Sequence, residues 1–110
     1  MCLIVFSSLE DIKNESEYSF ILLANRDEYY DRPTKSIHWW KEGYLAGKDL
    51  KAGGTWLGVS EDGRFAAVTN YREDATVRES SRGDLVKNFL ENQILAEDYL
   101  QTLNKQDYAG

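Results

Sequence analysis

Two apolar runs near the start of the chain have the pattern of β-strands. Residues 2–6 read Cys-Leu-Ile-Val-Phe, and residues 19–24 read Ser-Phe-Ile-Leu-Leu-Ala. Short runs without polar interruption are typical of strands that are buried on both faces. The polar residues 7–18 connect the two runs as a loop or hairpin connection, so we expect the strands to pair as antiparallel neighbours.

Three less regular segments follow the second run. Residues 25–33 are densely charged and end in the only proline of the chain, which predicts a long turn. Residues 37–40 read Ile-His-Trp-Trp and predict a short extended piece. Residues 43–54 are rich in glycine and predict irregular backbone.

A β-hairpin is the clearest local prediction. Residues 55–60 and 64–69 are rich in β-forming side chains, and Glu61, Asp62 and Gly63 separate them. Asp-Gly between two such runs is typical of a hairpin turn, because glycine readily adopts a positive φ angle.

The last third of the chain predicts helices. Ser81 lies three residues before Asp84, which is the spacing of a capping box at a helix start. Apolar residues then recur at helical spacing, namely Leu85, Val86, Phe89 and Leu90. Residues 94–103 predict a second, short helix. Because strands precede helices instead of alternating with them, the order of elements favours an α+β fold.

Composition and charge narrow the range of functions. The 110 residues are enough for one domain, and a hydrophobic fraction of 42% argues against disorder. The net charge of −6 repels phosphate backbones, so we expect no nucleic-acid partner. No apolar run reaches the roughly 20 residues of a membrane span, and no signal-peptide pattern is present. We therefore expect a soluble, cytoplasmic protein.

The sequence favours a small-molecule ligand or substrate over a cofactor. Its single cysteine cannot form an internal disulfide, and its single histidine cannot complete a zinc cluster with it. His38 stands beside two tryptophans, where a role as a haem ligand is a weaker interpretation than simple packing. We expect no metal and no resident cofactor.

Cys2 is the first candidate catalytic residue. Methionine aminopeptidases remove Met1 when the second residue is small, and cysteine meets that condition. Removal of Met1 would place a free α-amine and a thiol on one residue, which then supplies both base and nucleophile. The alternative is a small buried hydrophobic residue, and position alone favours that alternative.

A cluster of polar residues follows the second predicted strand. Asn25, Arg26, Asp27 and Glu28 are consecutive. The guanidinium of Arg26 could bind a carboxylate or a developing oxyanion, and the acidic residues could orient it. If the two strands pair antiparallel, this turn lies near the start of the first strand and brings Arg26 and Asp27 towards Cys2. The alternative is a salt-bridged turn without a further role.

Glycines and polar residues flank the predicted hairpin. Gly53, Gly54, Thr55 and Trp56 lead into it, and Asn70 follows it. Glycines let the backbone approach a ligand closely, and the amide of Asn70 could donate to an oxyanion. No Gly-Lys-Ser/Thr follows, so the segment is not a phosphate-binding loop. A glycine hinge and a strand-end turn residue are the alternatives.

Several long motifs in order resemble one known family. They are Met-Cys-Leu-Ile-Val-Phe (1–6), Leu-Ala-Asn-Arg-Asp-Glu-Tyr-Tyr-Asp-Arg-Pro (23–33), Lys-Ala-Gly-Gly-Thr-Trp-Leu-Gly-Val-Ser (51–60), Gly-Arg-Phe-Ala-Ala-Val-Thr-Asn-Tyr-Arg (63–72) and Ser-Arg-Gly-Asp-Leu-Val (81–86). Across these motifs the chain resembles the NRDE family, also called the transport and Golgi organisation protein 2 family. Its members resemble N-terminal nucleophile hydrolases, which are αββα sandwiches of two antiparallel sheets. The resemblance implies that residues 1–110 form a single domain, the N-terminal half of a longer hydrolase-like domain.

The resemblance also implies roles for individual residues. Cys2 takes the nucleophile position. Cysteine amidases of that superfamily separate an arginine from an aspartate at the end of the second strand, whereas Arg26 and Asp27 are adjacent here, which departs from their pattern. Exposed sheet edges of such a fragment further predict a homodimer.

Two functions remain open at this point. The first is a cysteine amidohydrolase or acyltransferase that acts on a non-peptide C–N or thioester bond. The second is a binding or trafficking protein for haem, acyl-CoA or lipid. Members of the family have been linked to Golgi organisation, haem handling and acyl-CoA or lipid metabolism.

Overall fold

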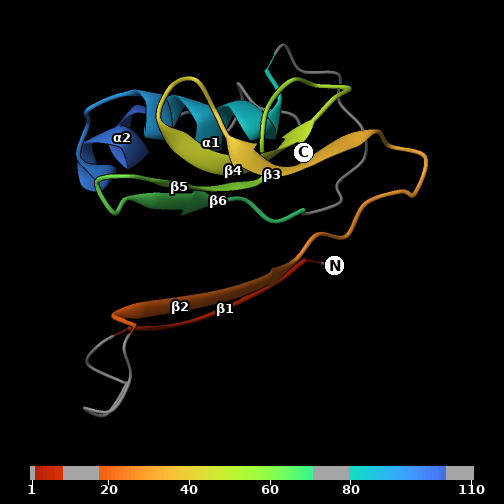
Figure 1. The fold of residues 1–110 in the computed structure, drawn as a ribbon. Helices are drawn as coiled ribbons and strands as arrows, with labels where there is room; N and C mark the ends of the chain where they lie inside the picture. Colours follow the sequence, from red (N-terminus) through yellow and green to blue (C-terminus); the bar gives the residue numbers. More distant parts are fainter. Residues whose placement is uncertain (1, 9–17, 71–79, 104–110) are drawn as a thin grey trace.

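The predicted α+β class is confirmed. A computed structural model describes residues 2–8, 18–70 and 80–103, which form two antiparallel sheets and two helices (Figure 1). The elements are β1 (Leu3–Ser8), β2 (Phe20–Asn25), β3 (Thr34–Trp39), β4 (Tyr44–Asp49), β5 (Leu57–Ser60), β6 (Phe65–Ala67), α1 (Arg82–Glu91) and α2 (Ala96–Thr102).

Strands β1 and β2 pair antiparallel, as the apolar runs predict. Leu3 lies opposite Asn25 at one end of this pair, and Ser8 lies opposite Phe20 at the other. Most of the predicted connection between them, residues 9–17, lies outside the described residues.

The prediction that both faces of these strands are buried is wrong for the described part of the chain. One face turns towards the rest of the fold, whereas Leu3 and Leu23 on the other face are 61% and 68% exposed. An apolar run shows what a strand is able to bury, but the layers above and below it decide how much is covered.

A four-stranded sheet follows, in the order β3-β4-β5-β6. The prediction of irregular backbone over residues 43–54 is wrong, because β4 occupies residues 44–49 at the centre of this sheet. Gly47 lies inside that strand for a packing reason: a Cβ atom there would come within 2.6 Å of the Trp56 ring. The glycine therefore admits a side chain from the neighbouring segment and does not break the strand.

The predicted hairpin is confirmed and joins β5 to β6. Val59 lies opposite Phe65, and the backbone N–H and the hydroxyl of Ser60 both donate to the carbonyl of Arg64. Gly63 has a φ angle of +82°, which side-chain-bearing residues rarely adopt.

Both predicted helices are present, and α1 begins with the predicted capping box. The Ser81 side chain accepts from the backbone N–H of Gly83, and the Asp84 carboxylate accepts from the backbone N–H of Ser81. Helix α1 contacts β4, β5 and β6. The hydroxyl of Tyr99 in α2 donates to the carbonyl of Leu85, which ties α2 to α1.

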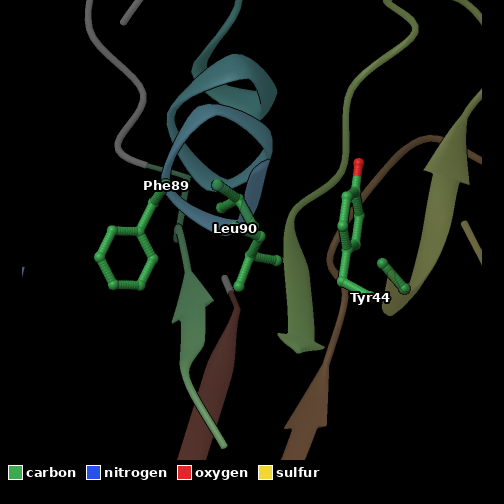
Figure 2. Close-up of a cluster of buried hydrophobic side chains, with 5 residues drawn as sticks. Tyr44, Phe89 and Leu90 are labelled. Carbon is green, nitrogen blue, oxygen red and sulfur yellow. The ribbon is translucent and has the colours of Figure 1, made fainter. Parts of the chain in front are cut away.

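The buried core lies between α1 and the four-stranded sheet (Figure 2). Its members are Tyr44, Ala46, Val86, Phe89 and Leu90. Burial of Val86, Phe89 and Leu90 contributes on the order of 1.5–3 kcal/mol for each side chain. Helix α1 is therefore held on the sheet by the apolar stripe that its sequence predicts.

Three layers result from this packing. The helices cover one face of the four-stranded sheet, and the β1–β2 pair lies on the other side (Figure 1). Phe65 connects the two sheets, since its ring centroid lies 6.3 Å from that of Phe6 and 5.0 Å from that of Phe20.

No helix among the described residues is long and apolar enough to cross a membrane. The predicted homodimer and the predicted domain boundaries remain predictions.

Candidate functional site

A polar cavity of about 100 Å³ brings together most of the candidate residues. Seven residues singled out from the sequence line it, namely Cys2, Arg26, Glu28, Gly54, Thr55, Trp56 and Asn70. They come from the start of β1, the segment after β2, the entry to β5 and the segment after β6. Residues far apart in the sequence thus converge on one hollow that contains the only cysteine of the chain.

The pairing of β1 with β2 explains why Cys2 and Arg26 meet. Leu3 is paired with Asn25, so the next residue outward on each strand places Cys2 beside Arg26. Side chains alternate between the faces of a sheet, and therefore Asn25 points to the opposite side from Arg26. Asn25 accordingly does not line the cavity.

Arg26 is held by contacts on several sides. Its Nη1 donates to the hydroxyl of Thr34, and its Nη2 donates to Oδ2 of Asp49 at 3.2 Å. Its Cζ lies 4.2 Å from the centroid of the Trp56 ring, within the range of a cation–π contact. These partners belong to β3, β4 and the entry to β5, so the four-stranded sheet fixes a side chain that directly follows a strand of the other sheet.

Asp49 is the most heavily bonded acid of the cavity. Its Oδ2 also accepts from Nε of Arg32 at 2.7 Å, and its Oδ1 accepts from the backbone N–H groups of Lys51 and Ala52. Burial opposes ionisation of this carboxyl, but the hydrogen bonds from Ala52 and Arg32 outweigh it and hold the pKa of Asp49 below its ordinary value. Asp49 is therefore a carboxylate at neutral pH.

A close backbone contact forms another wall of the cavity. Gly54 approaches the first turn of α1 so closely that a Cβ on it would lie 2.7 Å from the carbonyl carbon of Gly83. The backbone N–H of Thr55 points to the carbonyl of Gly83 at 3.4 Å. Gly54 and Gly83 thus allow the loop before β5 to pack directly on the start of α1.

Two further candidate residues lie beside the cavity without lining it. Asp27 presents its backbone carbonyl to the side-chain amide of Asn70 at 3.1 Å, which anchors one wall. Gly53 has a φ angle of +81° and open space around its Cα, so its role in the described structure is to turn the loop.

Several lining residues were not predicted from the sequence. They are Arg32, Asp49, Val68, Ser81, Arg82 and Gly83. Ser81 was recognised only as a helix cap, although the capping box gave the one available signal that a helix begins here. Asp49 carried a weaker signal, because aspartate before a glycine-rich loop commonly accepts backbone N–H groups.

A second, apolar cavity of about 440 Å³ lies at the β6 edge of the four-stranded sheet. It is lined by Ile4, Phe6, Phe65, Ala66, Ala67, Leu85, Val86, Phe89, Ala96, Tyr99 and Leu100. The two cavities share no lining residue, but successive residues on one face of the N-terminal segment line both: Cys2 lines the polar cavity, and Ile4 and Phe6 line the apolar one. The described residues contain no cluster of three or more potential metal ligands.

Comparison with known proteins places this arrangement in a family. The family model of Transport and Golgi organisation 2 matches residues 1–110. The chain belongs to the Transport and Golgi organisation 2 family. This confirms the resemblance carried by the sequence motifs.

Relatives in this family are longer than the chain. The mouse Transport and Golgi organization 2 homolog is 38% identical over 116 residues, which cover 98% of this chain and 41% of that protein. The human homolog is 37% identical over 114 residues, with the same coverage of each chain. An uncharacterized protein of Saccharomyces cerevisiae is 28% identical over 85 residues, which cover 67% of this chain and 27% of that protein. No solved structure matches the chain.

The chain corresponds to only part of its relatives. The chain spans 41% of the length of these mammalian relatives of the Transport and Golgi organisation 2 family. The residues that line the polar cavity therefore lie in the segment that this chain has in common with its longer relatives. Activity, substrates and partners of the whole protein are matters for proposal.

Proposed function

We propose that this protein is a cysteine N-terminal nucleophile enzyme, an amidohydrolase or acyltransferase that acts on a non-peptide C–N or thioester bond. One observation carries the proposal: Cys2 lies in the same polar cavity as Arg26 and Asn70. A nucleophile needs a neighbouring group that stabilises the negative charge it creates, and these side chains supply N–H donors at that place.

The arrangement of two antiparallel sheets also supports a hydrolase-like sandwich. β1 is paired with β2 in one sheet, a second sheet lies against it, and helices cover the outer face of the second sheet. These are three successive layers of the order α-β-β. In this proposal the residues described here form the N-terminal half of one αββα domain.

The proposed reaction begins after Met1 is removed. The α-amine of Cys2 takes the thiol proton, and the sulfur attacks the carbonyl carbon of the substrate. The C–N or C–S bond breaks, the leaving amine or thiol takes the proton from the α-amine, and an acyl thioester remains on Cys2. Water then releases the acyl group as an acid, or an acceptor amine or thiol takes it over.

Arg26 has the position and the donors to assist that attack. A guanidinium carries five N–H groups, more than its described hydrogen bonds to Thr34 and Asp49 use. The side-chain amide of Asn70 lines the same hollow and carries a second N–H besides the one that it donates to the carbonyl of Asp27. In the proposed enzyme these groups stabilise the tetrahedral oxyanion. Glu28 adds negative charge beside the arginines, at 3.8 Å from each.

Activity measurements on the whole protein test this function. A panel of chromogenic N-acyl amides and thioesters is incubated with the wild type and with Cys2→Ala and Cys2→Ser. All three residues are small, so Met1 removal is matched and only the nucleophile changes. We expect turnover to disappear in Cys2→Ala and to survive weakly in Cys2→Ser. Equal turnover in all three proteins would exclude Cys2 as the nucleophile.

The apolar cavity favours a second candidate function, that of a binding or trafficking protein. Its volume of about 440 Å³ and its apolar lining fit part of a haem, an acyl-CoA chain or another lipid-like ligand. Titration of the whole protein with haem and with a long-chain acyl-CoA tests this alternative. Binding of either ligand that is weakened by Ala66→Trp, together with no turnover of the substrate panel, would favour it over the enzyme.

A further inference from the structure

We infer that Asp49 is a positioning residue that sets Arg26 beside Cys2. The inference rests on the proposed function, since positioning matters only if Cys2 reacts with a ligand. Asp49 is the last residue of β4, whereas Cys2 directly precedes β1 and Arg26 directly follows β2. The carboxylate of Asp49, from the four-stranded sheet, therefore contacts Arg26 in the same cavity as Cys2.

The two oxygens of Asp49 have different partners. Oδ2 accepts from Nη2 of Arg26 at 3.2 Å and from Nε of Arg32 at 2.7 Å. Oδ1 accepts from the backbone N–H groups of Lys51 and Ala52, at 2.9 and 3.1 Å. The backbone bonds fix the orientation of the carboxylate, and the fixed carboxylate in turn fixes the two guanidinium groups.

The backbone of Asp49 also forms hydrogen bonds with the loop of residues 50–54, which follows β4. Its N–H donates to the carbonyl of Gly54 at 2.9 Å, and its carbonyl accepts from the N–H of Gly53 at 2.8 Å. This loop carries the chain to Trp56, whose ring lies against Arg26. Asp49 consequently restrains Arg26 directly through a charged hydrogen bond and indirectly through the ring that stacks on it.

Glu28 provides an internal comparison. It also lines the cavity, but its carboxylate lies 3.8 Å from both Arg26 and Arg32, beyond hydrogen-bonding distance. One of its oxygens accepts from the backbone N–H of Tyr29. Glu28 therefore contributes negative charge to the cavity without orienting the arginines as Asp49 does.

The two roles predict opposite effects on an anionic reagent. A carboxylate that contributes only charge repels anions, so its neutralisation speeds their approach to Cys2. A carboxylate that positions Arg26 attracts anions indirectly, so its neutralisation slows them. Iodoacetate and iodoacetamide transfer similar alkyl groups to a thiol but differ in charge. The ratio of their rate constants at Cys2 measures this local attraction.

The test uses the whole protein, with alkylation of Cys2 read by peptide mass spectrometry. We expect Asp49→Asn and Arg26→Gln each to lower the iodoacetate-to-iodoacetamide ratio by about threefold to fivefold. We expect the double variant to show no further decrease, because Asp49 acts through Arg26. Glu28→Gln, the matched control, removes the same charge from the same cavity and leaves the ratio unchanged or raised.

A ratio that rises in Asp49→Asn, as charge removal alone predicts, would overturn the inference. Additive decreases in the double variant would overturn it as well. If Asp49→Asn does not fold, Asp49→Ser is measured in its place, because the serine hydroxyl still accepts backbone N–H groups of the loop but does not reach the arginines. Alkylation requires no turnover, so an inactive protein with the expected ratios would refute the proposed function and leave the positioning role intact.

Discussion

The contact between Gly54 and Gly83 makes a quantitative prediction for Gly54→Ala. The added Cβ would lie 2.7 Å from the carbonyl carbon of Gly83 and 3.0 Å from its Cα and its oxygen. All three atoms belong to the backbone, so no rotation of a side chain can relieve the overlap. The loop before β5 and the first turn of α1 must therefore move apart.

The expected cost follows from the geometry. Overpacking of a well-packed interior costs about 1–3 kcal/mol. Alanine recovers about 0.4–1 kcal/mol by restricting the unfolded chain. Taking the middle of each range, we expect the free energy of unfolding to fall by about 1.3 kcal/mol, a shift of roughly tenfold in the unfolding equilibrium. Urea denaturation of the whole protein measures this difference.

The second effect concerns the cavity. Because Gly54 and Gly83 both line it, their separation should expose Cys2 and raise its rate of alkylation by iodoacetamide. Gly58→Ala is the matched control, since a Cβ there would meet the flexible end of Leu90 at 2.7 Å, away from the polar cavity. It should cost about 1 kcal/mol and leave the alkylation of Cys2 unchanged. Wild-type stability and wild-type alkylation in Gly54→Ala would refute the reasoning.

Three further predictions concern the framework around the site. Arg64 donates to the carbonyls of Phe89, Leu90 and Asn92 at the end of α1, so Arg64→Lys should lower the free energy of unfolding by about 1–2 kcal/mol; urea denaturation showing no loss would contradict this. The lowered pKa of Asp49 stabilises the folded state above the pKa of the unfolded chain, near 4, and this stabilisation is lost as the pH falls through the folded pKa. Asp49→Asn should therefore flatten the loss of stability on acidification, and an unchanged acid profile would contradict this. Phe65→Ala removes the ring between Phe6 and Phe20, so amide hydrogen exchange in β1 and β2 should accelerate while exchange in β4 does not; equal acceleration in both sheets would contradict this.

Local signals were enough to predict several elements. The β5–β6 hairpin depends on adjacent residues, since Gly63 supplies the positive φ angle between two β-forming runs. The start of α1 depends on Ser81 and Asp84, which bond to each other's backbone. The conformation of such elements is determined by a few neighbouring residues, so they can be predicted without knowledge of the rest of the fold.

Features that depend on distant partners could not be predicted in the same way. β4 was missed because Gly47 looks like a strand breaker until Trp56 is found against it. Asp49 was missed because Arg26, its partner, is 23 residues away in the sequence and follows a strand of the other sheet. The proximity of Cys2 and Arg26 could be predicted because it requires a single assumption, namely that the first two strands pair antiparallel.

The proposed chemistry requires that Cys2 become the first residue of the mature protein. Mass spectrometry of the N-terminal peptide, from the whole protein isolated from its natural source, measures this directly. We predict a peptide that begins at Cys2 with a free α-amine. A peptide that retains Met1, or a blocked amine on Cys2, would contradict the assignment of Cys2 as nucleophile and base.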